Sequence, residues 1–206
     1  MGGFAALPEH GAPEGVASIA LLGMAQDGWA LFAASPEAED GAEDPMDRWS
    51  LRVITTLADE VGAVPLFPFG GPPYQPFLRW AAATGQIWPS PLGMSIHAER
   101  GLWMSFRGAL GFAEAREDLV AISSQRPCDT CADKPCLSAC PVDAFADGFY
   151  DVPTCVGHIA TPAGADCLGT GCKARHACPI GRDWAPAPPQ ATFHMGAYLR
   201  ARASDR

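Results

Sequence analysis

The sequence predicts an α+β fold in two parts, a sheet-and-helix domain followed by a cysteine-rich domain. Three observations lead to this prediction. Short apolar segments with strand character alternate with segments of helical spacing over the first 125 residues. All eight cysteines lie between Cys128 and Cys178. Hydrophobic residues make up 48% of the 206 residues and charged residues 18%, which is enough apolar material for a packed core.

The first domain is expected to form one layer of strands with two helices. Short apolar runs bounded by glycine, proline or polar residues predict the strands, at 16–25, 63–67, 92–97 and 102–112. The helices are expected at 45–61 and 76–83. The acidic segment 35–44 that precedes the first helix is expected to be a solvated loop.

The helix at 45–61 has the clearest end signals. Asp44 is the expected N-cap with Pro45 at the first helical position, and Gly62 is the expected stop. The apolar residues at helical spacing predict the buried face, which would consist of Trp49, Val53, Leu57 and Val61.

The character of the sequence changes near residues 123–126, where hydrophobic periodicity weakens and cysteines begin. We therefore expect an α+β domain at 1–125, a cysteine-rich domain at 126–184, and a linker with a closing helix at 185–206. The linker is the proline-rich stretch 185–189, and the closing helix would cover 191–203. That helix is expected to pack through Phe193 and through Tyr198 or Leu199.

Charge and hydropathy exclude several functions. The net charge of −9 disfavours binding to a nucleic-acid backbone. The longest apolar stretch, 16–25, is about half as long as a membrane span requires, so no membrane partner is expected. No charged and then apolar leader opens the chain, which indicates a reducing, cytoplasmic location. Thiols crowded into one quarter of such a chain favour metal binding over disulfides.

The cysteines form two related runs. The first is C-x2-C-x4-C-x3-C-P, from Cys128 to Cys140, and the second is Cys155, Cys167, Cys172 and then Cys178 followed by Pro179. This arrangement resembles the two-cluster bacterial ferredoxins, in which the fourth cysteine of each run crosses to the other cluster. The resemblance implies two 4Fe-4S clusters. Their ligands would be Cys128, Cys131, Cys136 and Cys178 for one cluster, and Cys155, Cys167, Cys172 and Cys140 for the other.

Two other interpretations of the cysteines are two structural zinc sites or free thiols. Zinc sites usually use C-x2-C pairs, and only one such pair is present here. His158 and His176 lie among the cysteines, but eight thiols already complete two sets of four. We therefore expect both histidines to lie outside the ligand sets.

The second run also resembles the ferredoxin-like part of epoxyqueuosine reductases and reductive dehalogenases. The similarity covers about 55 residues and lies in the lone Cys155, followed by a compact group that ends at Cys178. The chain departs from the epoxyqueuosine reductases because it is much shorter before the cysteines and lacks their helical-repeat extension. Together with the acidic charge, this argues against tRNA modification.

The segment 96–108 resembles a histidine-containing stretch of the CblC family of cobalamin-processing proteins. It follows the pattern H-x3-G-x-W-x3-R-G. The resemblance implies a trimmed nitroreductase-like domain that holds cobalamin, with a cofactor pocket formed by His97, Gly101, Trp103, Arg107 and Gly108. The same residues also fit structural roles, as a strand-end histidine, core aromatics and an arginine paired with a carboxylate.

These resemblances leave three functions open. In the first, a reductase passes electrons from the clusters to a corrinoid, or to a substrate, in the first domain. The second is a ferredoxin-type carrier that serves a redox partner protein. The third, a flavin reductase, lacks a glycine-rich phosphate motif. A corrinoid enzyme needs a large cavity in the first domain, whereas a carrier would fill that space with Phe77, Trp80 and Trp88.

Overall fold

The computed structural model of the chain describes residues 2–146 and 148–203. Contacts divide it into two compact units. The sheet unit comprises Met1–Trp88 and Met104–Gln125, and the cysteine unit comprises Pro89–Trp103 and Arg126–Arg206. One division falls after Gln125, and Pro89–Trp103 groups with the cysteine unit and not with the rest of the first 125 residues.

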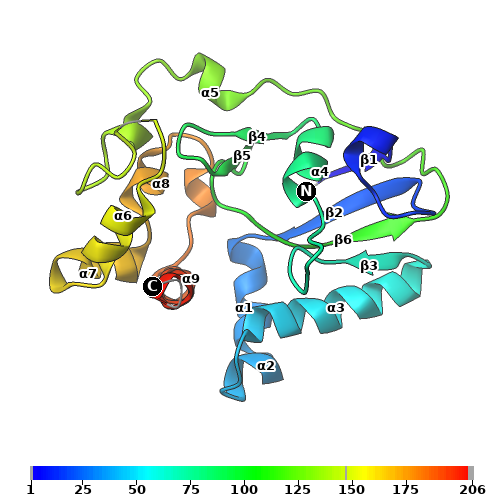
Figure 1. Cartoon of the computed structure of the whole chain (residues 1–206), viewed down its shortest axis with the longest axis horizontal. Helices are drawn as coiled ribbons and strands as arrows, with labels where there is room; N and C mark the ends of the chain where they lie inside the picture. The colour runs from blue at the N-terminus through cyan, green and yellow to red at the C-terminus, as the bar shows by residue number, and fades with distance from the viewer. Residues whose placement is uncertain (1, 147, 204–206) are drawn as a thin grey trace. The chain divides into compact units, whose positions relative to one another are not determined.

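The sheet unit is built on a four-stranded antiparallel sheet with the order β1-β2-β6-β3 (Figure 1). Its strands are β1 (Gly2–Ala5), β2 (Ser18–Met24), β3 (Val64–Leu66) and β6 (Ser105–Phe112). Three of them overlap the expected strands at 16–25, 63–67 and 102–112. The sequence analysis did not anticipate β1, which pairs with β2 through Phe4 and Ile19.

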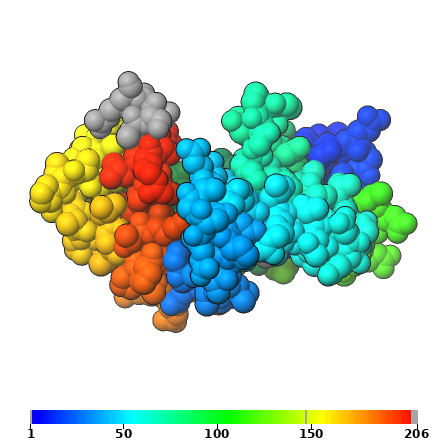
Figure 2. All heavy atoms as spheres, turned by 90° about the horizontal axis from the view of Figure 1, so that it is seen from below, coloured from blue at the N-terminus to red at the C-terminus, as the bar shows by residue number. Residues whose placement is uncertain are grey.

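Two helices cover opposite faces of this sheet. Successive strand residues point to opposite sides, so each strand can supply apolar side chains to both helices. Helix α4 (Phe77–Ala83) packs Phe77 and Trp80 against Ile19 and Leu21. Helix α3 (Pro45–Val61) packs Ile54 and Ala58 against the other face, through Leu110 and Phe112. Figure 2 shows the atoms of α3, in light blue to cyan, spread over its side of the unit.

The buried face of α3 differs from the prediction. The fully buried positions are Met46, Ser50, Ile54 and Ala58, whereas Val53 and Val61 are exposed. Small residues at positions 50 and 58 allow the helix to approach the sheet closely, and apolar periodicity alone does not detect such a contact. Asp44 does precede the helix, but its side chain makes no capping hydrogen bond; Gly62 ends the helix with φ at 68°.

The acidic segment 35–44 is partly helical, so the expectation of a solvated loop is wrong for its first half. Helix α2 (Pro36–Glu39) lies against α3, and the Glu37 carboxylate accepts hydrogen bonds from Arg52 at 2.5 and 2.9 Å. Arg48 of α3 donates to both oxygens of Asp40 at 2.7 Å. Two arginines on α3 therefore attach this acidic segment to the sheet unit. The remaining short helices here are η1 (Pro8–His10), η2 (Gln26–Gly28) and α1 (Trp29–Ala33).

The cysteine unit contains short helices joined by loops. Strands β4 (Ile87–Pro89) and β5 (Ser95–His97) form a two-stranded sheet; β5 lies in the cysteine unit, and β4 ends where the chain enters it. The helices that follow are α5 (Pro127–Thr130), η3 (Pro135–Leu137), α6 (Val152–Ile159), η4 (Pro162–Gly164), α7 (Ala165–Thr170), α8 (Lys173–Ala177), η5 (Arg182–Trp184) and α9 (Pro188–Ala203). Helix α9 includes the expected closing helix and begins inside the expected linker.

The fold is therefore α+β with small antiparallel sheets, as the sequence predicts. Within residues 2–146 and 148–203, no helix has both the length and the apolar character needed to cross a lipid bilayer.

Candidate metal centre

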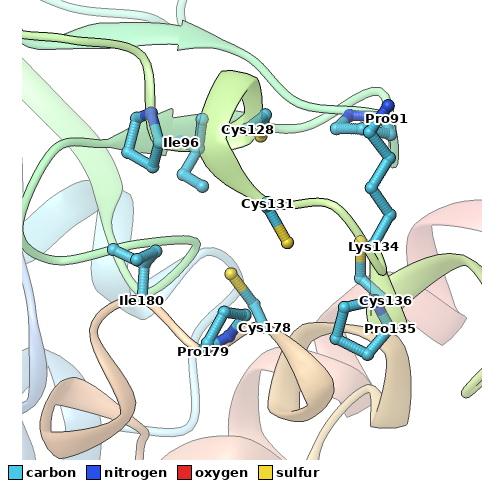
Figure 3. Close-up of a pocket in the computed structure, with 11 residues that line it drawn as sticks. Pro91, Ile96, Cys128, Cys131, Lys134, Pro135, Cys136, Cys178, Pro179 and Ile180 are labelled. Atoms are coloured by element: carbon cyan, nitrogen blue, oxygen red, sulfur yellow. The ribbon is translucent and has the colours of Figure 1, made fainter.

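Four cysteines from three separate places in the sequence surround one hollow in the cysteine unit. Cys128 lies in α5, Cys131 follows that helix, Cys136 lies in η3 and Cys178 follows α8. All four line a hollow with about 310 Å³ of empty space, part of which is open to solvent. Figure 3 shows the sulfurs of Cys131 and Cys178 pointing into the same space from opposite sides. We call these four residues the first cysteine group.

Prolines and short helical turns place the first cysteine group. Pro127 and Pro135 each occupy the beginning of a helical turn that carries a cysteine, where a missing N–H costs nothing. Lys134 adopts a left-handed conformation with φ at 40°, which reverses the chain between Cys131 and Cys136. The rest of the lining is mostly apolar and includes Ile96.

The other four cysteines form a second cysteine group, Cys140, Cys155, Cys167 and Cys172. Cys155 lies in α6, Cys167 in α7, and Cys172 is the N-cap residue of α8. Burial raises the pKa of the Cys155 thiol, and the negative charges of Cys172, Cys140 and Cys167 raise it further. The four thiols are therefore near enough for their charges to affect one another.

Helix α8 connects the two cysteine groups. Cys172 precedes this five-residue helix and belongs to the second group, whereas Cys178 follows it and belongs to the first. In the first cysteine run, Cys136 belongs to the first group and Cys140 belongs to the second. The four cysteines that line the hollow, and the four whose charges affect one another, are the two sets that the ferredoxin resemblance implies; that these sets bind clusters stays a prediction.

The donor atoms of both groups are sulfurs. All eight cysteines are free thiols. In the part of the chain that the structure describes, no group of three or more histidine, cysteine or acidic side chains is close enough to hold a metal ion. Four thiols around one hollow are nevertheless the type of donor that a four-iron cluster uses.

Burial raises the pKa of several of these thiols. It is the largest cause of the raised pKa of Cys128, Cys136 and Cys167, and the thiolates of neighbouring cysteines raise each pKa further. The charge of Arg126 acts in the opposite direction on Cys128, as does that of Lys173 on Cys167. The free chain therefore favours protonated thiols, and binding of a metal-containing group would release protons.

The residues implied by the CblC resemblance are divided between the two units. His97, Gly101 and Trp103 belong to the cysteine unit, whereas Arg107 and Gly108 belong to the sheet unit. Two hollows in the part of the chain that the structure describes, one at the first cysteine group and one in the sheet unit beside Val64 and Leu66, are not lined by any of the five.

His97 and Gly101 form a tight turn. His97 is 4% exposed, and its Nδ1 accepts hydrogen bonds from the backbone N–H groups of Glu99 and Arg100 at 3.1 and 3.2 Å. Burial lowers the pKa of His97, which favours the neutral ring. Gly101 pairs with His97 and has φ at 59°, and a Cβ at this position would collide with the carbonyl of Ile180. The turn therefore packs against the segment that follows Cys178 and Pro179.

Trp103 is a core residue of the cysteine unit. It is 3% exposed, and its ring contacts two side chains of α8. The guanidinium carbon of Arg175 is 4.3 Å from the ring centroid, and the His176 ring centroid is 4.7 Å away. Arg175 also donates a hydrogen bond to the carbonyl of Leu102. Trp103 thus supports the helix that separates Cys172 from Cys178.

Arg107 and Gly108 have packing roles in the sheet unit. Arg107 is paired with Asp47 of α3, with 3.1 Å between Nη1 and Oδ1. Burial raises the pKa of Asp47 and lowers that of Arg107, and the ion pair opposes both changes. A Cβ at Gly108 would lie 2.6 Å from Cδ1 of Ile54, so glycine allows α3 to approach β6.

Two features of the cysteine unit are not among the expectations from the sequence. The first is the segment 89–103, which contributes Pro91 and Ile96 to the lining of the first cysteine group's hollow. The second is Tyr150, whose hydroxyl lies 2.8 Å from the hydroxyl of Tyr198 in α9. No sequence pattern indicates this contact. His176 is not in either cysteine group; its Nε2 is 2.9 Å from the carbonyl oxygen of Thr170.

Comparison with family models, with curated proteins and with solved structures finds no match to this chain.

Proposed function

We propose that this chain is an electron-transfer protein that carries two 4Fe-4S clusters, one in each cysteine group. The observation that supports this most is the convergence of eight thiols into two sets of four, each completed by a cysteine from the other run. In this proposal the cysteine unit is ferredoxin-like. When bound, the clusters supply one-electron chemistry at low potential.

The chain's own residues would hold the clusters and limit the access of water. Three of the ligands are buried, namely Cys136, Cys167 and Cys178, with exposed fractions of 9%, 7% and 6%. Ile96 and Ile180 add apolar surface to the first group's hollow. Apolar surroundings that limit the access of water favour the less negative oxidation state of a cluster and therefore a low reduction potential.

The sheet unit would provide the surface for a redox partner. It contains 14 acidic and 5 basic residues, whereas the cysteine unit contains nine of each. The whole net charge of −9 therefore resides on the sheet unit. A surface of this sign steers association with a basic protein and makes the rate dependent on ionic strength.

We prefer this carrier to the corrinoid reductase. Cobalamin binding was implied for five residues, and each of them already has a packing partner: the Glu99–Arg100 backbone, Ile180, α8, Asp47 or Ile54. Phe77 and Trp80 fill the core of the sheet unit, with exposed fractions of 5% and 0%, as a carrier requires.

The first test is anaerobic reconstitution of the full chain with iron and sulfide. About eight iron and eight sulfide per chain, with electron paramagnetic resonance signals of reduced 4Fe-4S clusters, would support the proposal. Bound zinc without sulfide would contradict it. Reduction of a basic acceptor such as cytochrome c should then slow as salt increases.

A cobalamin titration of the same preparation separates the two functions. The carrier leaves the cobalamin spectrum unchanged before and after dithionite is added. A shift to the base-off spectrum, followed by cluster-dependent reduction of cobalt, would support the corrinoid reductase instead and overturn the carrier.

A further inference from the structure

A hollow lies in the sheet unit, at the edge of the sheet that β3 forms. It contains about 750 Å³ of empty space, part of which is open to solvent. Its lining comes from the loop before β2, from β3 and from the end of β6, and all of these segments belong to the sheet unit. We call it the sheet hollow.

The apolar part of the lining is formed where two strands pair. Gly111 of β6 is the register partner of Val64 in β3. A Cβ at Gly111 would lie 2.9 Å from Val64, 3.1 Å from Val16 and 3.2 Å from Leu66, so these three side chains meet over the glycine. Val64 is 49% exposed. Solvent-accessible apolar surface is therefore present in the hollow, and a partner that covered it would gain free energy.

Strand β3 is unsuited to pairing with a strand of another protein. It is the last strand of the sheet order and has a neighbour, β6, on one side. Its central residue is Pro65, which has no N–H to donate. Proline is found in edge strands where the missing N–H faces away from the neighbouring strand, and it blocks the addition of a further strand there. A partner would therefore use side chains in this hollow.

Negative charge gathers at the sheet hollow. Glu14 is exposed and belongs to the lining. Glu60 lies two residues before Gly62 of the lining, and Glu114 directly follows Ala113 of the lining; both glutamates are exposed. In the part of the chain that the structure describes, none of the three glutamates forms an ion pair, and no basic side chain lines the hollow. The hollow thus combines apolar walls with uncompensated negative charge.

We propose that the sheet hollow is the docking site of a basic redox protein, which inserts a lysine or arginine side chain into it. This inference rests on the proposed function. Lysine and arginine carry a charged group on an aliphatic stem, so the stem would pack on Val16, Val64 and Leu66 while the charge meets Glu14. The sheet unit has 14 acidic and 5 basic residues, which favours a partner of opposite charge.

The test is calorimetric titration of the oxidised, reconstituted full chain with oxidised cytochrome c, a basic redox protein, at low salt. Glu14→Gln removes one charge from the hollow and should weaken binding about threefold. Ala113→Phe keeps the charge and places a ring at the hollow, so it should weaken binding at least about tenfold. Asp27→Asn and Ala33→Phe are the matched controls, at exposed positions outside the lining. Asp27→Asn should weaken binding less than Glu14→Gln does, and Ala33→Phe should leave it unchanged.

Each contrary result has a distinct meaning. Equal weakening by Glu14→Gln and Asp27→Asn would show that the charge of the whole unit attracts the partner, and would refute docking at the hollow. Unchanged affinity in Ala113→Phe would refute the insertion of a side chain. If Ala113→Phe loses the hydrogen-exchange protection of β2 and β6, Glu14→Gln decides, because it changes an exposed side chain.

Two further results separate this inference from its basis. If free N-acetyl-lysine amide binds as tightly as cytochrome c, the hollow is a site for a small cation and the protein partner is refuted. Failure of the unaltered chain to take up clusters would refute the proposed function. A chain that takes up both clusters but binds cytochrome c equally well in every variant refutes the docking site alone.

Discussion

The sheet unit and the cysteine unit are organised around different kinds of interior. In the sheet unit, apolar side chains from α3 and α4 cover both faces of one antiparallel sheet. In the cysteine unit, short helices place thiols around a hollow and around each other. An apolar core stabilises a fold by burial alone, whereas the thiolates of a cluster site are stabilised by the positive charge of the iron they bind. In the proposed function, only the cysteine unit would depend on a bound group for its order.

Removal of iron is expected to have the largest effect, because it should destabilise the cysteine unit and leave the sheet unit intact. Chelation under anaerobic conditions should reduce the hydrogen-exchange protection of α6 and α7 at least about a hundredfold, because binding and folding are coupled at such sites. Protection of β2 and β6 should remain. Hydrogen exchange followed by mass spectrometry measures both in one experiment, and equal loss in the two units would contradict the comparison.

Serine substitutions test the division of the thiols. Cys136→Ser should remove the cluster of the first group and Cys155→Ser that of the second, so each variant should retain about half the iron and the double variant none. Iron analysis and the electron paramagnetic resonance spectrum check this. Ser138→Ala, an exposed position two residues from Cys136, is the control. Loss of the same cluster in both single variants would show that the assignment is wrong.

The interior of the sheet unit can be weakened without affecting the clusters. Ile54 is 5% exposed, and Ile54→Ala should lower the free energy of unfolding of this unit by about 2–5 kcal/mol through loss of contacts and a cavity. The iron content should not change. Val53 is 37% exposed, so Val53→Ala should cost less than about 0.5 kcal/mol. Denaturant titration measures both losses of stability. A loss in Val53→Ala as large as that in Ile54→Ala would contradict the burial of Ile54 and the exposure of Val53.

The smallest effect concerns the ion pair between α2 and α3. The hydrogen bond from Arg52 is the largest cause of the lowered pKa of Glu37, which is about 2 instead of 4.5. A depressed carboxyl pKa contributes stability that is present above pH 4.5 and is lost as pH falls towards 2. Because the Arg52 side chain is 53% exposed, solvent screens the pair and the effect should be modest.

Glu37→Gln should lower the melting temperature of the sheet unit slightly at neutral pH and flatten its decline between about pH 4.5 and pH 2.5. Glu39→Gln, which removes an equal charge from an exposed position on the same helix, is the control. An unchanged slope in Glu37→Gln would mean that the pair does not couple folding to pH.

The two units also differ in how far the sequence predicts them. Helices at 45–61 and 76–83 and three strands of the sheet have strong local signals, in end residues and in apolar runs, and all of them are present. The side of α3 that is buried depends on how closely the helix approaches the sheet at Gly108 and Ala58, which is a property of the packing. Strand β1 has no clear apolar alternation of its own and exists because β2 supplies its hydrogen bonds.

The segment 96–108 is divided between the two units, although its residues are adjacent in sequence. Contacts assign its first part to the cysteine unit and its last part to the sheet unit. Gly101 fits closely beneath the Ile180 carbonyl, and Gly108 fits against Ile54. Neither of these partners can be identified from spacing, because each comes from a distant part of the chain.

The sequence by itself determined the α+β class, the position at which the cysteines begin, and the pattern of two runs that each end in cysteine and proline. These features depend on local propensity and on the types of residue present, both of which can be read along the chain. The tertiary structure decided how Pro89–Trp103 groups with the cysteines, which face of α3 is buried, and that the Tyr150 hydroxyl contacts the hydroxyl of Tyr198. Those outcomes depend on contacts between residues far apart in sequence or on side-chain packing, and they are settled only when the chain folds.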